Sequence, residues 1–142
     1  MTGQMPIFSM RGVPVSETIE YCNSSGSKVF AMVESKDAVD HADEIAAVEG
    51  VDVVLVGSMD LTIDMGIGGK FDSPEYRTAL ERVSQACRAH GKVFGVAGVY
   101  DNPEIQDWII NTLGARYMLV QQDTSLLLRG GVRAVTDLPS VS

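Results

Sequence analysis

The sequence predicts an α/β fold of four consecutive strand–helix units whose strands lie parallel in one sheet. Two observations predict it. Short apolar runs recur along the chain, and the longer segments between them begin and end with helix signals. The apolar runs span residues 28–34, 51–56, 92–97 and 116–121. Because strands joined through a helix run parallel, their carboxyl ends are expected on one edge of the sheet.

The segment before the first strand predicts little regular structure. Residues 1–13 contain Gly and Pro without periodicity, which is typical of a lead-in loop. Ser16 is placed to cap a short helix over 17–23, and the Ser-Ser-Gly run at 24–26 is expected to end it. We therefore assign residues 1–27 to a lead-in loop and a short helix.

The next helices are predicted from the capping residues at their ends. Ser35 is an N-cap residue, and it predicts a helix over 36–48 with a break near His41. After the second strand, residues 60–65 predict a short helical turn that the following glycine closes. Residues 67–72 are rich in glycine and predict a loop.

The strongest helix start in the chain is Ser73-Pro74-Glu75, with a cap, a proline at the first helical position and an acid in the first turn. Apolar residues then recur at i, i+3, i+4 and i+7, which predicts one buried face. That stripe consists of Tyr76, Ala79, Leu80, Val83, Ala86 and Cys87. Gly91 is expected to end the helix.

The last two units are predicted in the same way. Asn102-Pro103-Glu104 begins a helix that Gly114 ends, and residues 124–135 form the last helix. We expect a single domain over 1–142, with the strand–helix units at 28–135 and a tail at 136–142.

Composition limits the function. The 142 residues carry a net charge of −8 without a Lys/Arg cluster, which argues against nucleic-acid or acidic-membrane partners. The two cysteines, Cys22 and Cys87, form no CxxC motif and predict reduced thiols. No apolar stretch approaches membrane-spanning length and no signal-peptide core is present, so a soluble cytoplasmic protein is expected.

Two carboxylates follow neighbouring strands. Glu34 ends the first apolar run, and Asp60 comes shortly after the second. Parallel strands lie about 4.8 Å apart, so both side chains can reach one divalent cation at the carboxyl rim. The simpler alternative is that each carboxylate only stabilises the helix that begins beside it.

The charges of the strand ends distinguish the two rims. The strands begin with Lys28, Lys92 and Arg116, which predicts a basic amino-terminal rim. The opposite rim is acidic, and parallel α/β folds bind ligands there. Its residues include Glu34, Ser58 to Asp60, Tyr100, Asp101 and Gln121 to Asp123. An acidic rim favours a metal site or a cationic substrate.

Other motifs predict no catalytic site. The segment 66–70 resembles a phosphate loop only faintly, because it follows a helical turn and lacks the Lys-Ser/Thr ending. His41 and His90 lie on helices away from the acidic rim, and Tyr76 and Trp108 fall on apolar helix faces. No Ser/His/Asp or Cys/His constellation can be assembled, so the catalytic residues are not assigned.

Three segments carry a resemblance to a known family. They are Val33 to Ala38, Asp43 to Asp52 and Val56 to Thr62, and the likeness extends over roughly 28–128. These segments resemble the HpcH/HpaI aldolase/citrate lyase family. That family forms metal-dependent (β/α)8 TIM barrels that cleave or form carbon–carbon bonds next to a 2-oxo acid. The resemblance implies that this chain corresponds to the second half of such a barrel.

The resemblance also implies roles for individual residues. Glu34 and Asp60 match the family's two ligands for Mg²⁺ or Mn²⁺, and the backbone of Ser58, Met59 and Asp60 matches the segment that binds the substrate carboxylate. The implied activity is a class II aldolase-like lyase acting on pyruvate-derived 4-hydroxy-2-oxo acids. Ser58 and Met59 depart from the expected proline and small residue, and the bulkier Met59 is expected to narrow the pocket.

The first half of the barrel would supply an arginine that clamps the substrate and a histidine base, and neither has a counterpart here. The alternative is therefore a non-catalytic remnant that binds a metal or a partner. A half-barrel has open edges and an uncovered face. We expect self-association, or a chain that supplies the missing half, with a small 2-oxo acid as ligand. The alternative is a sheet that stays open in a doubly wound arrangement.

Overall fold

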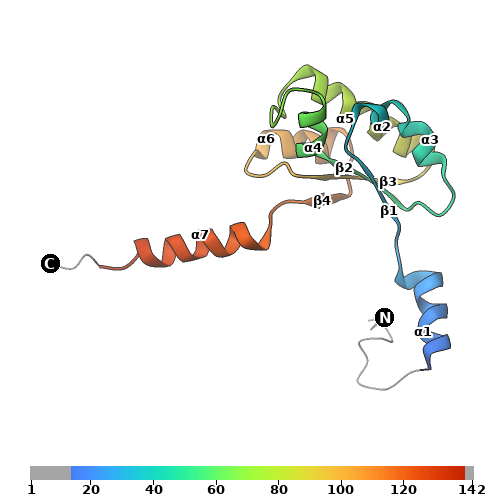
Figure 1. Ribbon diagram of the computed structural model, residues 1–142, viewed down its shortest axis with the longest axis horizontal. Coiled ribbons are helices and arrows are strands. Elements are labelled where there is room, and N and C mark those ends of the chain that lie inside the picture. Colours follow the sequence, from blue (N-terminus) through green and yellow to red (C-terminus); the bar gives the residue numbers. More distant parts are fainter. Residues whose placement is uncertain (1–13, 140–142) are drawn as a thin grey trace.

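The computed structural model describes residues 14–139, and the predicted lead-in loop at 1–13 lies outside them. Its centre is a sheet of four parallel strands in the order β1-β2-β3-β4 (Figure 1). The strands are β1 (Phe30–Val33), β2 (Val53–Gly57), β3 (Val93–Ala97) and β4 (Tyr117–Leu119). The predicted α/β fold of consecutive parallel units is confirmed, and each strand is shorter than its apolar run.

Helices follow every strand, as predicted. These helices are α2 (Lys36–Asp40), α3 (Ala42–Ala47), α4 (Ser58–Asp64), α5 (Pro74–Ala89), α6 (Pro103–Asp107) with the π-helical segment η3 (Trp108–Thr112), and α7 (Asp123–Thr136). Helix α1 (Val15–Tyr21) and the π-helical segment η2 (Cys22–Gly26) precede β1. Ser35, Ser73 and Asn102 each accept a hydrogen bond from the backbone amide three residues later. The predicted break at His41 separates α2 from α3.

The predicted cap of the first helix is wrong. Helix α1 begins at Val15 with Pro14 at the N-cap position, and Ser16 lies inside the first turn. The carbonyl of Pro14 accepts the hydrogen bond from the Thr18 amide at 3.1 Å, so the turn closes one residue before the serine hydroxyl is needed. The chain also continues into η2 instead of ending at the serine pair.

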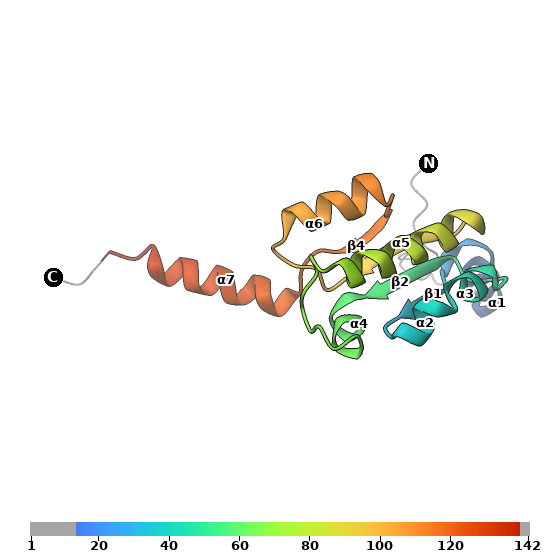
Figure 2. The ribbon, with the colours of Figure 1, turned by 90° about the horizontal axis from the view of Figure 1, so that it is seen from above.

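The hydrophobic core lies between the sheet and the helices on its outer face. All five residues of β2 are buried. Helix α5 packs on β2 and β3, and the six residues of its predicted apolar stripe are all buried (Figure 2). Cys87 is among them, and burial raises the pKa of its thiol to about 11, so the thiol stays protonated and unreactive. Trp108 is only partly buried and stacks under the Arg77 guanidinium.

The inner face of the sheet is strongly curved. The rings of Phe30 on β1 and Tyr117 on β4 lie 4.9 Å apart, although two strands separate them. In a flat sheet those edge strands would be about 14 Å apart. Gly95 permits the contact, because a Cβ there would lie 3.2 Å from the Tyr117 Cβ and 3.1 Å from a Leu55 methyl carbon. The sheet therefore has the curvature of half a barrel.

The last helix does not pack on this fold. Helix α7 has no buried residue and projects away from the sheet in both views (Figures 1 and 2). Its exposed apolar side chains are Leu126, Leu127, Leu128, Val132 and Val135. Its polar link to the body of the protein is an ion pair between Arg129 and Asp101. No helix of the described residues is long and apolar enough to cross a membrane.

The amino-terminal rim of the sheet carries the three predicted basic residues, and each of their side chains donates a hydrogen bond within the protein. The ammonium of Lys28 donates to Asp52 at 2.8 Å. Lys92 donates to the Val51 carbonyl at 2.8 Å, and Arg116 donates to the Ala115 carbonyl at 2.9 Å. These bonds therefore hold the three cations at the starts of the strands, where they line a groove on this rim.

We expect the replacement Asp52→Asn to lower the stability of the fold in a pH-dependent way. The hydrogen bond from Lys28, with that from the Val29 amide, holds the pKa of Asp52 below its usual value. A carboxyl whose pKa is lower in the folded state stabilises the fold above its unfolded pKa, and this contribution is lost as the pH falls through the folded pKa. The difference between wild type and variant should be constant above about pH 5 and disappear on acidification.

Thermal unfolding followed by circular dichroism between pH 2 and pH 7 measures this difference. The replacement Asp72→Asn, at an exposed carboxylate for which the described residues show no ion pair, is the matched control and should shift the melting temperature far less. A difference that grows on acidification would contradict the assignment.

Candidate metal and 2-oxo acid site

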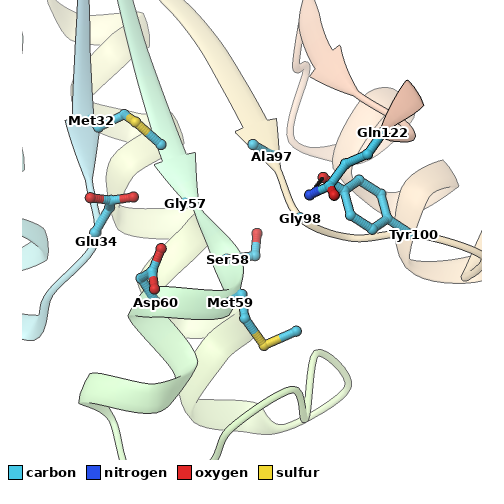
Figure 3. Close-up of a pocket in the computed structure, with 10 residues that line it drawn as sticks. All are labelled: Met32, Glu34, Gly57, Ser58, Met59, Asp60, Ala97, Gly98, Tyr100 and Gln122. Carbon is cyan, nitrogen blue, oxygen red and sulfur yellow. Dashed lines mark hydrogen bonds between the residues drawn. The ribbon is translucent and has the colours of Figure 1, made fainter. Parts of the chain in front are cut away.

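The carboxyl ends of the strands surround a cavity of about 310 Å³. Glu34 after β1 and Asp60 on α4 enter it from one side, and Tyr100 after β3 and Gln122 after β4 enter it from the other (Figure 3). The complete lining is Met32, Glu34, Gly57, Ser58, Met59, Asp60, Ala97, Gly98, Tyr100 and Gln122. The structure thus brings together all the residues to which the sequence assigned metal or substrate binding.

Glu34 reaches the cavity by lying across the end of the neighbouring strand. A Cβ on Gly57 would stand 2.5 Å from its carboxylate oxygen Oε1 and 2.8 Å from its Cγ. Contacts that short do not occur between real atoms, so only glycine at the end of β2 leaves room for this orientation. Gly57 therefore positions the carboxylate, a role that its sequence context did not reveal.

Asp60 is the third residue of its helix, two positions later than the sequence predicted. Helix α4 begins at Ser58, directly after β2, and not at Asp60. The side chain of Thr62 holds this first turn, because its hydroxyl bonds the carbonyls of Ser58 and Met59 at 2.9 Å each. The same hydroxyl accepts from the Gly69 amide at 2.9 Å, which ties the glycine-rich loop to the turn.

The hydroxyl of Ser58 accepts a hydrogen bond from within the protein. The hydroxyl of Tyr76 donates to it at 2.7 Å, and both side chains are buried. Burial also raises the pKa of Tyr76 far above its usual value, so this phenol remains a neutral donor. Ser58 can therefore offer a ligand its backbone and the proton of its own hydroxyl, which the bond from Tyr76 does not use.

Gly98 leaves the backbone amide of Met59 uncovered, because glycine has no side chain. It has a φ of +91°, and a Cβ there would lie 3.4 Å from the Met59 nitrogen. The side chain of Met59 is 47% exposed at the lip of the cavity (Figure 3). The expected narrowing of the pocket by this methionine therefore leaves an open cavity.

The carboxylates of Glu34 and Asp60 have the chemistry of a ligand pair for a hard divalent cation. Within residues 14–139, neither is hydrogen-bonded or paired with a cation, and no third His, Cys, Asp or Glu joins them. Mg²⁺ is usually held by one or two carboxylates, with water and substrate oxygens completing the octahedron. The residues present therefore fit such an ion.

Basic groups are missing from this cavity over the part of the chain that the structure describes. Lys36 lines a separate groove between α2, α4 and α5, and Lys70 lies in the glycine-rich loop. His41 contacts the Asp37 carbonyl, and His90 bonds Asp43. As the sequence predicted, neither histidine reaches the acidic rim.

The acidic rim is less acidic than the sequence implied. Asp101 was counted as part of it, but its carboxylate is paired with Arg129 of α7, which holds the pKa of Asp101 below its usual value. Tyr100 and Gln122 enter the cavity in its place. Their position after two strands placed them on the rim, but the sequence assigned them no role.

We expect Gly57→Ala to weaken the binding of Mn²⁺ without unfolding the protein. The new methyl group displaces the Glu34 side chain, and one misplaced ligand should cost roughly threefold to tenfold in affinity, about 0.7–1.4 kcal/mol. Gly68→Ala is the control, because a Cβ there meets only an Ile63 carbon at 3.8 Å.

Calorimetric titration with Mn²⁺ measures both affinities, and circular dichroism checks that both variants fold. Equal affinity of Gly57→Ala and wild type would show that the position of Glu34 does not matter for the metal.

Comparison with known proteins places this geometry in a family. The sequence model of the HpcH/HpaI aldolase/citrate lyase family matches residues 10–107. A 4-hydroxy-4-methyl-2-oxoglutarate aldolase of Hapsidospora irregularis is 46% identical over 141 residues, which are 99% of this chain and 52% of that protein. An aldolase of the same description from Chaetomium globosum is 48% identical over 132 residues, 93% of this chain and 49% of its own length.

Solved structures agree with the fold. The crystal structure of an HpcH/HpaI aldolase from Desulfitobacterium hafniense superposes with a TM-score of 0.74 at 28% identity, covering all of this chain and 55% of the other. The chain spans about half the length of the curated relatives it matches. Its four units correspond to half of an aldolase barrel, and the chain belongs to the HpcH/HpaI aldolase/citrate lyase family.

Proposed function

We propose that the chain binds a divalent cation, Mg²⁺ or Mn²⁺, through Glu34 and Asp60 and holds a 2-oxo acid against it, as part of a carbon–carbon lyase. The observation that carries this proposal is the pair of carboxylates at adjacent strand ends, which face one open cavity beside the first turn of α4. Relatives described as 4-hydroxy-4-methyl-2-oxoglutarate aldolases support the substrate class.

Each group of the chain has a defined part in this proposal. A bound cation would act as a Lewis acid that polarises the 2-oxo group. Glu34 and Asp60 hold and orient that cation, and Gly57 gives Glu34 the room to do so. The backbone of Ser58, Met59 and Asp60 faces the substrate carboxylate, and Thr62 fixes this turn before the ligand arrives.

Binding of pyruvate tests the proposal without requiring turnover. Calorimetry of the purified chain should show pyruvate binding in the presence of Mn²⁺ and its loss after chelation. Asp60→Ala should abolish the Mn²⁺-dependent part of the signal. Pyruvate that binds equally well with and without the metal would disprove the assignment of this site.

A second candidate function is a metal-binding or partner-binding module without turnover. The observation that favours it is the absence of a basic group from the cavity lining within residues 14–139. Release of pyruvate from a 4-hydroxy-2-oxo acid, with and without Mn²⁺, distinguishes the two. The lyase releases pyruvate only with the metal, whereas the module binds the metal and releases none.

We expect the chain to self-associate at micromolar concentration. Its inner face exposes Phe30, Met32, Tyr117 and Leu119, and β1 and β4 are edge strands. Monomeric proteins rarely leave such edges and apolar faces open. Light scattering coupled to size exclusion measures the mass in solution. A stable monomer of 15.3 kDa would rule out closure of the barrel by self-pairing.

A further inference from the structure

The side of the cavity opposite the two carboxylates is neutral and polar. Tyr100 comes from the loop after β3, and Gln122 comes directly after β4 (Figure 3). The side-chain amide nitrogen of Gln122 donates to the Tyr100 hydroxyl at 3.4 Å. We call these two residues the distal wall, because one to three strand spacings separate them from Asp60 and Glu34, roughly 5–14 Å in an uncurved sheet.

The loop that carries Tyr100 is held on both sides of this residue. The side-chain amide of Gln106 donates to the Val99 carbonyl at 2.9 Å. Asp101 has a φ of +54°, in the left-handed region that Asp tolerates better than most residues. Two hydrogen bonds from the Arg129 guanidinium hold its carboxylate, one of them at 3.0 Å from Nη1 to Oδ1. Tyr100 is therefore fixed at the cavity and does not depend on a ligand for its place.

The hydrogen bond within the distal wall leaves one donor unused. A tyrosine hydroxyl has one proton to donate and also accepts. Gln122 supplies the proton that the Tyr100 oxygen accepts, and no residue of 14–139 accepts the phenolic proton, which can therefore point into the cavity. The distal wall is thus suited to an oxygen acceptor, and an alkyl group there would make no hydrogen bond with this donor.

We infer that Tyr100 and Gln122 select, among 2-oxo acids held at the metal, those with an oxygen acceptor at the end remote from the 2-oxo group. This inference rests on the proposed function and deepens it by naming the two residues that contact the end of the substrate remote from the metal. The shared chemistry is a terminal hydroxyl or carboxylate, which accepts the Tyr100 proton. A terminal methyl group cannot.

Three ligands of equal chain length separate these cases. They are 2-oxoglutarate with a terminal carboxylate, 5-hydroxy-2-oxopentanoate with a terminal hydroxyl, and 2-oxopentanoate with a terminal methyl. Their dissociation constants for the whole chain are measured by calorimetry with Mn²⁺ present. The wild type should bind at least one of the two oxygen-bearing ligands more tightly than 2-oxopentanoate, and the preferred one identifies the terminal group.

The replacement Tyr100→Phe should weaken the preferred ligand roughly threefold to tenfold, the range for one lost hydrogen bond, and leave 2-oxopentanoate unchanged. Tyr117→Phe makes the same chemical change on the inner face of the sheet, where the ring packs on Phe30, and should change none of the three. Circular dichroism verifies that both variants are folded.

Each outcome decides the inference. Equal binding of all three ligands by the wild type would show that the distal wall does not select ligands. An equal effect of Tyr100→Phe on all three would show the same. Neither result would contradict the proposed metal site. A wild type that binds none of them with Mn²⁺ overturns the proposed function, and the inference falls with it.

Discussion

Replacing Glu34 or Asp60 by alanine is expected to weaken the binding of Mn²⁺ at least tenfold, a loss of about 1.4 kcal/mol. The two carboxylates face one cavity, and no third ligand side chain joins them within the described residues. Loss of either carboxylate removes one of the two protein ligands and leaves the ion with a single carboxylate and water. The effect should therefore be similar for the two positions.

Calorimetry of the variants and the wild type under identical conditions checks this expectation. Glu104→Gln, at an exposed carboxylate in the first turn of α6, is the control for a change of net charge. Wild-type affinity in Asp60→Ala would show that the metal binds elsewhere. A loss of similar size in Glu104→Gln would show that long-range charge, and not coordination, sets the affinity.

The second large expected effect concerns turnover. Aldolase activity of the isolated chain should be at least a hundredfold below that of a full-length relative assayed alongside it. Aldol cleavage needs a base for the hydroxyl proton, and positioned acid–base groups are typically worth 10²–10⁴-fold in rate. It also benefits from a cation that clamps the substrate carboxylate. The described lining of the cavity offers neither.

Pyruvate release from a 4-hydroxy-2-oxo acid, coupled to an indicator enzyme and repeated after chelation, measures this difference. Turnover close to that of the relative, abolished by chelation, would contradict the expectation. Lys70 is then the residue to replace first, because it lies in the loop that Thr62 ties to the first turn of α4. Lys70→Met should remove that activity, and Lys36→Met, in the separate groove, is the control.

Local sequence signals predicted most of the fold correctly. Ser35, Ser73 and Asn102 accept the expected amide hydrogen bonds, because a cap and its partner lie only three residues apart. The buried stripe of α5 follows from helical periodicity alone. Element ends were less predictable, as the start of α4 at Ser58 shows, because the Thr62 side chain and pairing with β3 decide where β2 stops.

The sequence by itself determined the parallel units, and with them the rim on which Glu34 and Asp60 meet, because both follow from the order and period of its elements. The tertiary structure decided which side chains on that rim face the cavity. Gly57 leaves room for the Glu34 side chain, and Arg129 forms an ion pair with Asp101, which does not line the cavity. Tyr100 and Gln122 meet because β3 and β4 pair as neighbouring strands, with Ala97 opposite Leu119. Such contacts depend on strand register and curvature, which act between residues far apart in the chain and leave no periodic pattern in it.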